Sequence, residues 1–185
     1  CDLLLDEGAR HVPLAAAFPE LAARTLTLWA PSKTFNLAGL TTACAVIPDA
    51  ALRRRFAAVA RGLTPDGNVL GLLAAEAAYG QGEPWRQALL EVLRGHRQAL
   101  VERVARWPGV TMSAPESTYL AWLDLRQAPA LAGSDSPQQA LLQRAGVALS
   151  DGADFGAPGF ARLNFGTTAT QLEAALARLD GVLAG

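Results

Sequence analysis

The sequence predicts an α/β fold in which helices pack on a small sheet. Hydrophobic residues make up 51% of the 185 residues, which is enough apolar side chain to bury a sizeable core. Short β-branched and aromatic runs alternate with longer segments in which apolar residues recur at helical spacing. From residue 84 onward the predicted order is helix, two strands, helix, two strands, helix, which is typical of helices layered on one small sheet.

Two short strands are predicted near the start of the chain. Residues 24–30 alternate and contain β-branched and aromatic side chains, and Pro31 ends that run. Residues 41–47 are a second short apolar run, which Pro48 ends. The loop that follows the first strand therefore lies at its carboxyl end, where ligand sites of α/β sheets collect.

Helices are predicted over residues 49–61, 67–79 and 84–107. Asp49 and Asp66 are suitable caps for the first two, because an aspartate side chain can accept a hydrogen bond from a free amide of the first turn. The third is a long amphipathic helix with leucines and valines on one face, and Pro108 stops it.

The second half of the chain is predicted to contain four more strands and two helices. The strands cover residues 110–112, 119–125, 147–150 and 160–165. Ser136 and Pro137 have the pattern of a helix start, and that helix runs to residue 145. Thr168 or Thr170 caps a final helix that ends near Leu183.

Composition argues against several classes of function. The 16 basic and 17 acidic residues nearly cancel, whereas a nucleic-acid surface needs a basic stripe. No apolar run reaches the roughly 18 residues of a membrane-spanning helix. Two cysteines and two histidines lie without zinc-binding spacing, so no metal site is expected. A reducing, cytoplasmic compartment fits this use of cysteine.

Lys33 is the only lysine in the chain, beside 15 arginines. In such an arginine-rich composition a retained lysine is a candidate for chemistry that arginine cannot do, such as imine formation by a primary amine. A chance survivor is the alternative. A loop position after a buried strand favours partial desolvation of the amine, and the neighbouring hydroxyls of Ser32 and Thr34 are able to bind a phosphate. An ordinary surface lysine remains the other interpretation.

The segment APSKTFNLAGL, residues 30–40, resembles the lysine segment of class I/II aminotransferase-like enzymes of fold type I. The similarity is to the MalY/PatB branch, which includes carbon–sulfur lyases of the cystathionine β-lyase type. The resemblance implies that Lys33 forms a Schiff base with pyridoxal 5'-phosphate and later moves the proton at the substrate Cα. Ser32 is implied as a cofactor-binding neighbour.

A second matching segment is PGFARLNFGTT, residues 158–168. The resemblance implies that Arg162 binds the substrate α-carboxylate, and a planar guanidinium suits that role because it binds carboxylates bidentately. A structural ion pair is the alternative for this arginine. Residues 113–125 resemble a strand of the family's small domain, in which Tyr119 either lines the substrate pocket or is an ordinary strand aromatic.

The resemblance covers nearly the whole chain but only the C-terminal half of the family's usual length. It implies that residues 1–48 are the tail of the large cofactor domain and that residues 49–185 form the small C-terminal domain. The chain lacks an initiating methionine and begins abruptly, so we expect it to be cut from a longer protein. The family's pyridine-binding aspartate and glycine-containing phosphate cradle lie upstream. Thr41 stands where many relatives carry a phosphate-binding arginine.

Three functions follow as expectations. The first is a lyase that acts on cystathionine-like amino acids, and the second is an aminotransferase that uses the same lysine and arginine. The third is an inactive, cofactor-free fragment that serves at most as an interaction module. The resemblance also implies a homodimer.

Overall fold

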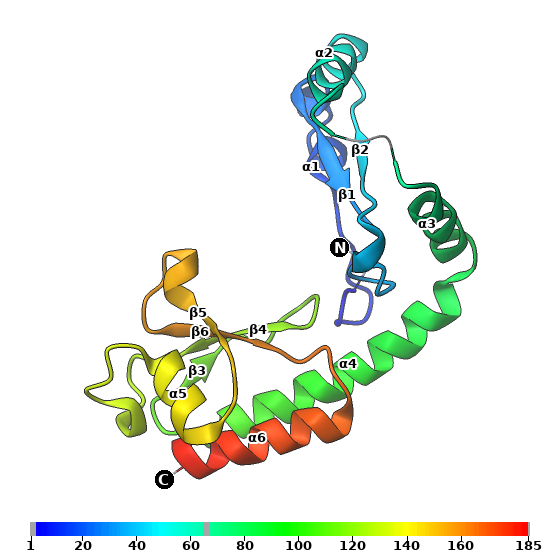
Figure 1. The fold of residues 1–185 in the computed structure, drawn as a ribbon. Coiled ribbons are helices and arrows are strands. Elements are labelled where there is room, and N and C mark those ends of the chain that lie inside the picture. The colour runs from blue at the N-terminus through cyan, green and yellow to red at the C-terminus, as the bar shows by residue number, and fades with distance from the viewer. Residues whose placement is uncertain (1–2, 65–66, 185) are drawn as a thin grey trace. The chain divides into compact units, whose positions relative to one another are not determined.

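The computed structural model describes residues 3–64 and 67–184, which divide into two compact units (Figure 1). The first unit consists of residues 8–89 together with Leu3, and the second consists of residues 4–7 together with Leu90 and the residues after it. The domain boundary predicted between residues 48 and 49 stays a prediction.

The first unit is built around a two-stranded antiparallel sheet. β1 (Thr27–Trp29) pairs with β2 (Cys44–Val46), and Leu28 lies opposite Ala45. Both strands lie inside the predicted ranges but are only three residues long. The helical elements are α1 (Leu14–Ala17), η1 (Pro19–Arg24), η2 (Ala38–Leu40), α2 (Ala50–Ala60), α3 (Val69–Gln81) and the start of α4 (Glu83–Val104).

Side-chain caps fix where two of these helices begin. The Asp49 carboxylate accepts a hydrogen bond from the Leu52 amide at 2.7 Å, which confirms the predicted start of α2. The Asn68 side chain caps α3 by accepting from the Leu70 amide at 3.0 Å. Asp66, the predicted cap, lies outside the described residues.

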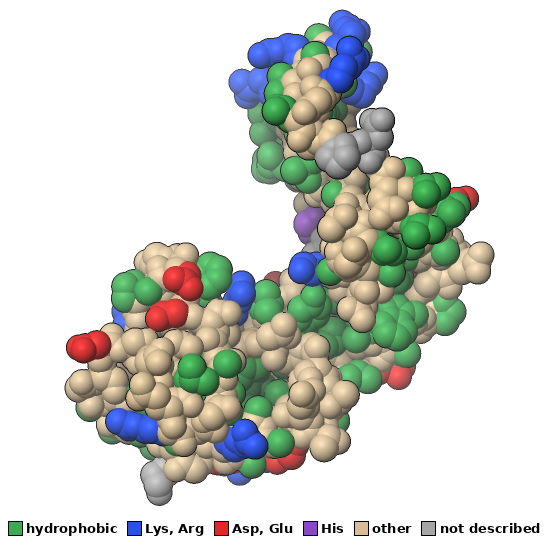
Figure 2. Space-filling model, viewed as in Figure 1, with side chains coloured by type: hydrophobic (Ala, Val, Ile, Leu, Met, Phe, Trp, Pro, Cys, Tyr) green, Lys and Arg blue, Asp and Glu red, His purple; other side chains and the backbone are tan. Residues whose placement is uncertain are grey.

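The first unit buries few apolar side chains. Leu3 and Ile47 are its only buried large hydrophobic residues within the described part of the chain. Many others are exposed, among them Leu28, Val46, Val59, Leu63, Val69, Leu70, Leu73 and Trp85. Hydrophobic side chains are visible over α3 in Figure 2, and arginines gather over α2. Apolar exposure on this scale is typical of interaction surfaces.

The second unit contains a four-stranded antiparallel sheet in the order β3-β4-β6-β5. These strands are β3 (Thr111–Met112), β4 (Leu120–Asp124), β5 (Ser150–Asp151) and β6 (Phe160–Asn164). Arg162 is paired with Trp122 on one side and with Ser150 on the other. Because side chains alternate along a strand, Leu123 and Leu163 are buried on one face, while Trp122 and Arg162 lie on the opposite face.

Helices cover the apolar face of this sheet (Figure 1). They are the remainder of α4, α5 (Pro137–Ala145) and α6 (Ala169–Leu183). The core consists of fully buried side chains from helices and strands, including Leu93, Leu100, Leu123, Leu141, Phe165, Leu176 and Leu179. The predicted alternation of helices and strands is confirmed, as are the caps at Ser136 and Thr168. The fold is therefore a mixed α/β arrangement.

Polar contacts join α4 to α6 at the far end of the core. Arg103 forms ion pairs with Glu173 and Asp180, and the Trp107 indole donates to Asp180 at 2.7 Å. The hydrogen bond to Glu173 raises the pKa of Arg103 above its usual value. His96 of α4 is buried, and its Nδ1 lies 3.0 Å from the carbonyl oxygen of Phe165, just after β6. The His96 contact fixes the end of β6 against the long helix.

Candidate active site

Lys33 lies on a hydrogen-bonded turn that follows β1. The turn covers residues 31–36, and it is closed by the Phe35 amide, which donates to the Pro31 carbonyl at 2.9 Å. Lys33 itself is exposed, Ser32 is half-buried and Thr34 is buried. The sequence predicts partial desolvation of the lysine amine, but the described chain does not bury it.

Aromatic side chains anchor this turn within the first unit. The Tyr79 ring of α3 packs edge-on against Phe35, with centroids 5.5 Å apart, and against Trp29 at 4.9 Å. The Trp85 indole donates to the Thr34 carbonyl at 3.3 Å. A Cβ at Gly82 would lie 2.6 Å from the Phe35 ring, so this position must lack a side chain. The lysine is thus held through its neighbours, and its amine stays accessible.

The lysine turn fits one end of pyridoxal phosphate. A cofactor aldehyde requires a reachable primary amine, and Lys33 makes no ion pair with any described residue. The Ser32 hydroxyl beside it is able to donate to a phosphate oxygen. Thr41 is exposed in a left-handed conformation and brings no positive charge. Of the residues matched to the family's motif, only Lys33 and Ser32 suit the cofactor here.

Arg162 lies in the middle of the sheet face that points away from the core of the second unit. It is half-buried, and its Nη2 donates to the Ser150 hydroxyl at 3.2 Å. Its guanidinium carbon lies 4.6 Å from the centre of the Phe155 ring. Within residues 3–64 and 67–184 no carboxylate pairs with Arg162. The structural ion pair that the sequence left open as an alternative is therefore not formed with these residues.

The loop before β6 folds back and carries Phe155 to Arg162. Asp151 caps the short η4 helix (Gly152–Phe155) by accepting from the Ala153 amide at 2.9 Å. The Ala157 amide then donates to the Gly152 carbonyl at 2.9 Å. Gly152 is buried so tightly that an added Cβ would lie 2.4 Å from the Ala157 oxygen and 2.6 Å from the Phe160 oxygen. Its lack of a side chain is what allows the fold-back.

Replacing Gly152 by alanine is expected to lower the free energy of unfolding by about 1–3 kcal/mol, because the new methyl group would overlap two backbone oxygens. Thermal or urea unfolding of the chain measures the change. Gly181→Ala is the matched control: it lies in α6 with open space around its Cβ, so alanine should stabilise the chain by about 0.5–1 kcal/mol. A Gly152→Ala variant as stable as the parent would show that the loop tolerates the methyl group.

Tyr119 stands just before β4, and its carbonyl accepts from the Phe165 amide at 2.9 Å. Its half-buried ring packs across Gly166, where an added Cβ would lie 2.8 Å from the ring. A role of Tyr119 in lining a substrate pocket stays a prediction. Among the predicted site residues, Ser32 and Lys33 lie together in the first unit, and Arg162 and Tyr119 lie in the second.

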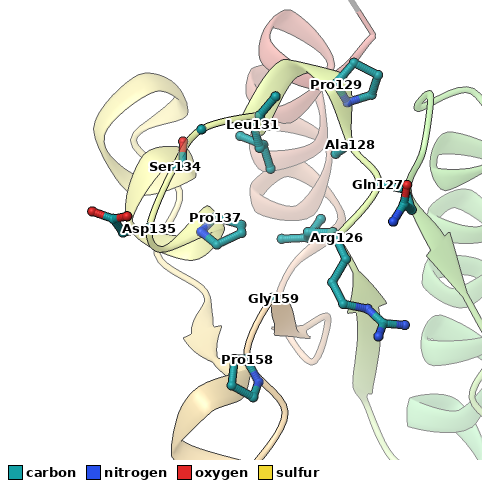
Figure 3. A pocket seen from close by; sticks show the side chains of 13 residues that line it. Arg126, Gln127, Ala128, Pro129, Leu131, Ser134, Asp135, Pro137, Pro158 and Gly159 are labelled. Atoms are coloured by element: carbon teal, nitrogen blue, oxygen red, sulfur yellow. The ribbon is translucent and has the colours of Figure 1, made fainter.

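A cavity of about 510 Å³ lies elsewhere in the second unit, beside the loop after β4 (Figure 3). Its lining comes from residues 125–129, 131–135 and 137, together with Pro158 and Gly159. None of the four predicted site residues lines it. Arg126 at its edge is paired with Asp124 at 2.7 Å, and this hydrogen bond lowers the pKa of that carboxyl. Asp135 is its other charged side chain, and because the lining contains none of the predicted site residues we assign the cavity no chemistry.

Two other kinds of site are not seen in the described parts of the chain. No group of three or more His, Cys, Asp or Glu side chains is placed there to hold a metal ion. None of the described helices combines the length and the apolar character needed to cross a membrane.

Sequence reasoning missed three neighbours of Arg162, namely Ser150, Phe155 and Trp122. Ser150 and Trp122 reach Arg162 because strands β5, β6 and β4 pair in one particular register, and Phe155 reaches it through a folded loop. The sequence feature that could have identified Phe155 is a large aromatic residue within a polar, glycine-rich loop. No local pattern signals the other two.

Comparison with known proteins relates the chain to several characterised enzymes. The family model for aminotransferase class I and II matches residues 8–179. Cystathionine beta-lyase PatB of Bacillus subtilis is 35% identical over 98% of the chain and 47% of its own length. Aspartate aminotransferase of Geobacillus stearothermophilus is 31% identical over 93% of the chain and 44% of its own length. The chain therefore spans about half the length of the curated relatives it matches.

Solved structures give the same relation. The crystal structure of OvoB superposes with a TM-score of 0.93 and 40% identity, covering 100% of this chain and 48% of that one. The crystal structure of the PLP-bound C-S lyase from Staphylococcus hominis gives a TM-score of 0.88 and 28% identity, covering 100% of this chain and 47% of the lyase. The predicted fold, the C-terminal half of a fold-type I pyridoxal-phosphate enzyme, agrees with these matches over about half of each structure.

Proposed function

Because the chain belongs to the aminotransferase class I and II family, we propose that it forms the C-terminal portion of a pyridoxal-phosphate-dependent carbon–sulfur β-lyase acting on cystathionine-like amino acids. The observation that carries the proposal is Arg162, a half-buried cation without a carboxylate partner among the described residues. The similarity to PatB over nearly the whole chain supports the choice of a lyase.

In this proposal three side chains of the chain divide the work. Lys33 and Ser32 would hold the cofactor, which when bound supplies an electron sink for negative charge that develops at the substrate Cα. Arg162 binds the substrate α-carboxylate through paired N–H donors and so orients the Cα–H bond. The Lys33 amine takes the proton from Cα. The Cβ–S bond then breaks, and the sulfur departs as a thiolate.

An assay of the complete enzyme tests the proposal directly. A lyase converts cystathionine and water into pyruvate, ammonia and homocysteine in equal amounts. Product formation that needs no added keto acid supports the lyase. A requirement for a keto acid as amine acceptor would contradict it.

An aminotransferase is the second candidate, and the 31% identity to an aspartate aminotransferase favours it. Both activities use Lys33 for proton transfer and Arg162 for the carboxylate, so these two residues do not separate them. In the transferase, Lys33 returns the Cα proton to the cofactor. Product formation in the assay above then requires an added keto acid.

We also propose that the complete enzyme is a cytoplasmic homodimer. The exposed apolar side chains of the first unit support association, since such a surface is costly in water. The mass of the complete enzyme in solution tests the dimer.

For the 185-residue chain alone we expect no stable cofactor binding and no activity, because Lys33 and Ser32 lack a pyridine-binding acid and a phosphate cradle in this proposal. The exposed edges of β1 and β2 are expected to drive self-association. Titration with pyridoxal phosphate, followed by visible absorbance, measures binding, and light scattering measures mass. Stoichiometric, low-micromolar binding by a monomer would contradict this prediction.

A further inference from the structure

Phe155 is placed unusually for a large aromatic residue. It ends the short η4 helix, and 52% of its surface is exposed, so it contributes little to the core. Its ring instead lies under the guanidinium of Arg162, with 4.6 Å between the guanidinium carbon and the ring centre. A cation above an aromatic face is attracted by the negative potential of that face.

The contacts of Arg162 leave a defined part of its guanidinium for a ligand. An arginine carries five N–H donors in one plane, and the Ser150 hydroxyl accepts from Nη2. The Phe155 ring covers one flat face of the guanidinium, and the flat faces carry no hydrogen-bond donors. The remaining in-plane donors have no carboxylate partner among the described residues, so an in-plane anion is the ligand that this arrangement suits.

Phe155 is itself held in place. Its ring packs edge-on against Trp122 with centroids 5.8 Å apart, and Trp122 stacks on Phe160 at 5.7 Å and 17°. Arg126 lies over the other end of this row, 4.6 Å from the Phe160 ring. Arg126 differs from Arg162 because Asp124 already pairs with it. The row of rings thus carries one neutralised arginine and one arginine without a carboxylate.

We propose that Phe155 is a positioning residue for Arg162, which fixes the guanidinium plane so that it receives the α-carboxylate of an amino-acid substrate. The identity of the ligand, a substrate α-carboxylate, rests on the proposed function. The placement of Arg162 by Phe155 does not depend on that function. A long arginine side chain loses less freedom on binding when a ring and a hydroxyl already restrict it. Phe155 acts through Arg162 and touches no reacting atom.

Two measurements test the proposal, the first on the 185-residue chain. Nuclear magnetic resonance of nitrogen-15-labelled arginines should show the Arg162 side-chain N–H signal shifted upfield by the Phe155 ring, and Arg162→Lys assigns that signal. Phe155→Leu should remove the shift, whereas Phe155→Tyr should keep it. Phe160→Leu is the matched control, since it should move the Arg126 signal and leave that of Arg162 in place. An Arg162 signal with the same chemical shift in the parent and in Phe155→Leu would overturn the placement.

The second measurement uses the complete enzyme. Phe155→Leu should raise KM for the amino-acid substrate roughly three- to ten-fold, the range expected for one cation–π contact, with kcat within about two-fold. Phe155→Tyr should restore the parent KM, and the absorbance of bound cofactor should not change. An unchanged KM, or a loss confined to kcat, would overturn the proposal. If the parent enzyme turns over no amino acid, the proposed function fails while the resonance measurement still decides the placement.

Discussion

Replacing Lys33 by alanine in the complete enzyme is expected to abolish the visible absorbance of lysine-bound cofactor and nearly all turnover. The change removes the only primary side-chain amine of this chain, and no arginine can replace it in imine formation. The proposed function gives Lys33 both the cofactor and the Cα proton, so its loss is the largest effect that we expect for any substitution in this chain.

Lys33→Arg separates the amine from the positive charge. Arginine keeps the charge and the length of the side chain, but its guanidinium stays protonated at neutral pH and does not form an imine. We therefore expect it to fail as completely as alanine. Borohydride should attach the cofactor permanently to the parent enzyme at Lys33, as peptide mass analysis will show. A cofactor still fixed by borohydride in Lys33→Ala would assign the attachment to another residue.

Local rules predicted the elements whose signals are local. Asp49, Ser136 and Thr168 are caps, and a cap depends on residues within one helical turn, so α2, α5 and α6 begin where the sequence indicates. Strand lengths depend on partners far away in sequence. β1 is shorter than predicted, and β5 covers Ser150–Asp151 where a strand over residues 147–150 was predicted, because a strand forms only where its neighbour pairs with it. The single turn of α1 has no periodic pattern to find.

The candidate site was predictable only where a motif exists. Lys33 stood out as a sole lysine, Arg162 lies in a segment that resembles the family, and the resemblance gave each a role. The packing of Phe155 beneath Arg162 depends on Gly152, where the fold-back leaves no room for a Cβ. The burial of Lys33 was expected from its position after a strand, yet the first unit leaves it exposed. Burial is set by the surrounding polypeptide, which a local pattern does not describe.

Arg162→Ala in the complete enzyme is expected to weaken transition-state binding of amino-acid substrates by about 2–5 kcal/mol, the usual cost of removing one member of a desolvated charge pair. This corresponds to a fall in kcat/KM of roughly 30- to 5,000-fold. The absorbance of bound cofactor should stay unchanged, because the proposal assigns Arg162 to the substrate. The dependence of rate on substrate concentration measures the effect.

Two further variants show whether the geometry of Arg162 matters beyond its charge. Arg162→Lys keeps the charge but loses the planar fork, the contact with Ser150 and the flat face above Phe155, so it should recover only a small part of the lost activity. Arg126→Ala is the matched control, because that arginine also lies over a phenylalanine but is already paired with Asp124. It should leave kcat/KM near the parent value. Equal activity of the parent enzyme on substrates with and without an α-carboxylate would refute the role of Arg162, since its N–H donors would then have no anion to hold.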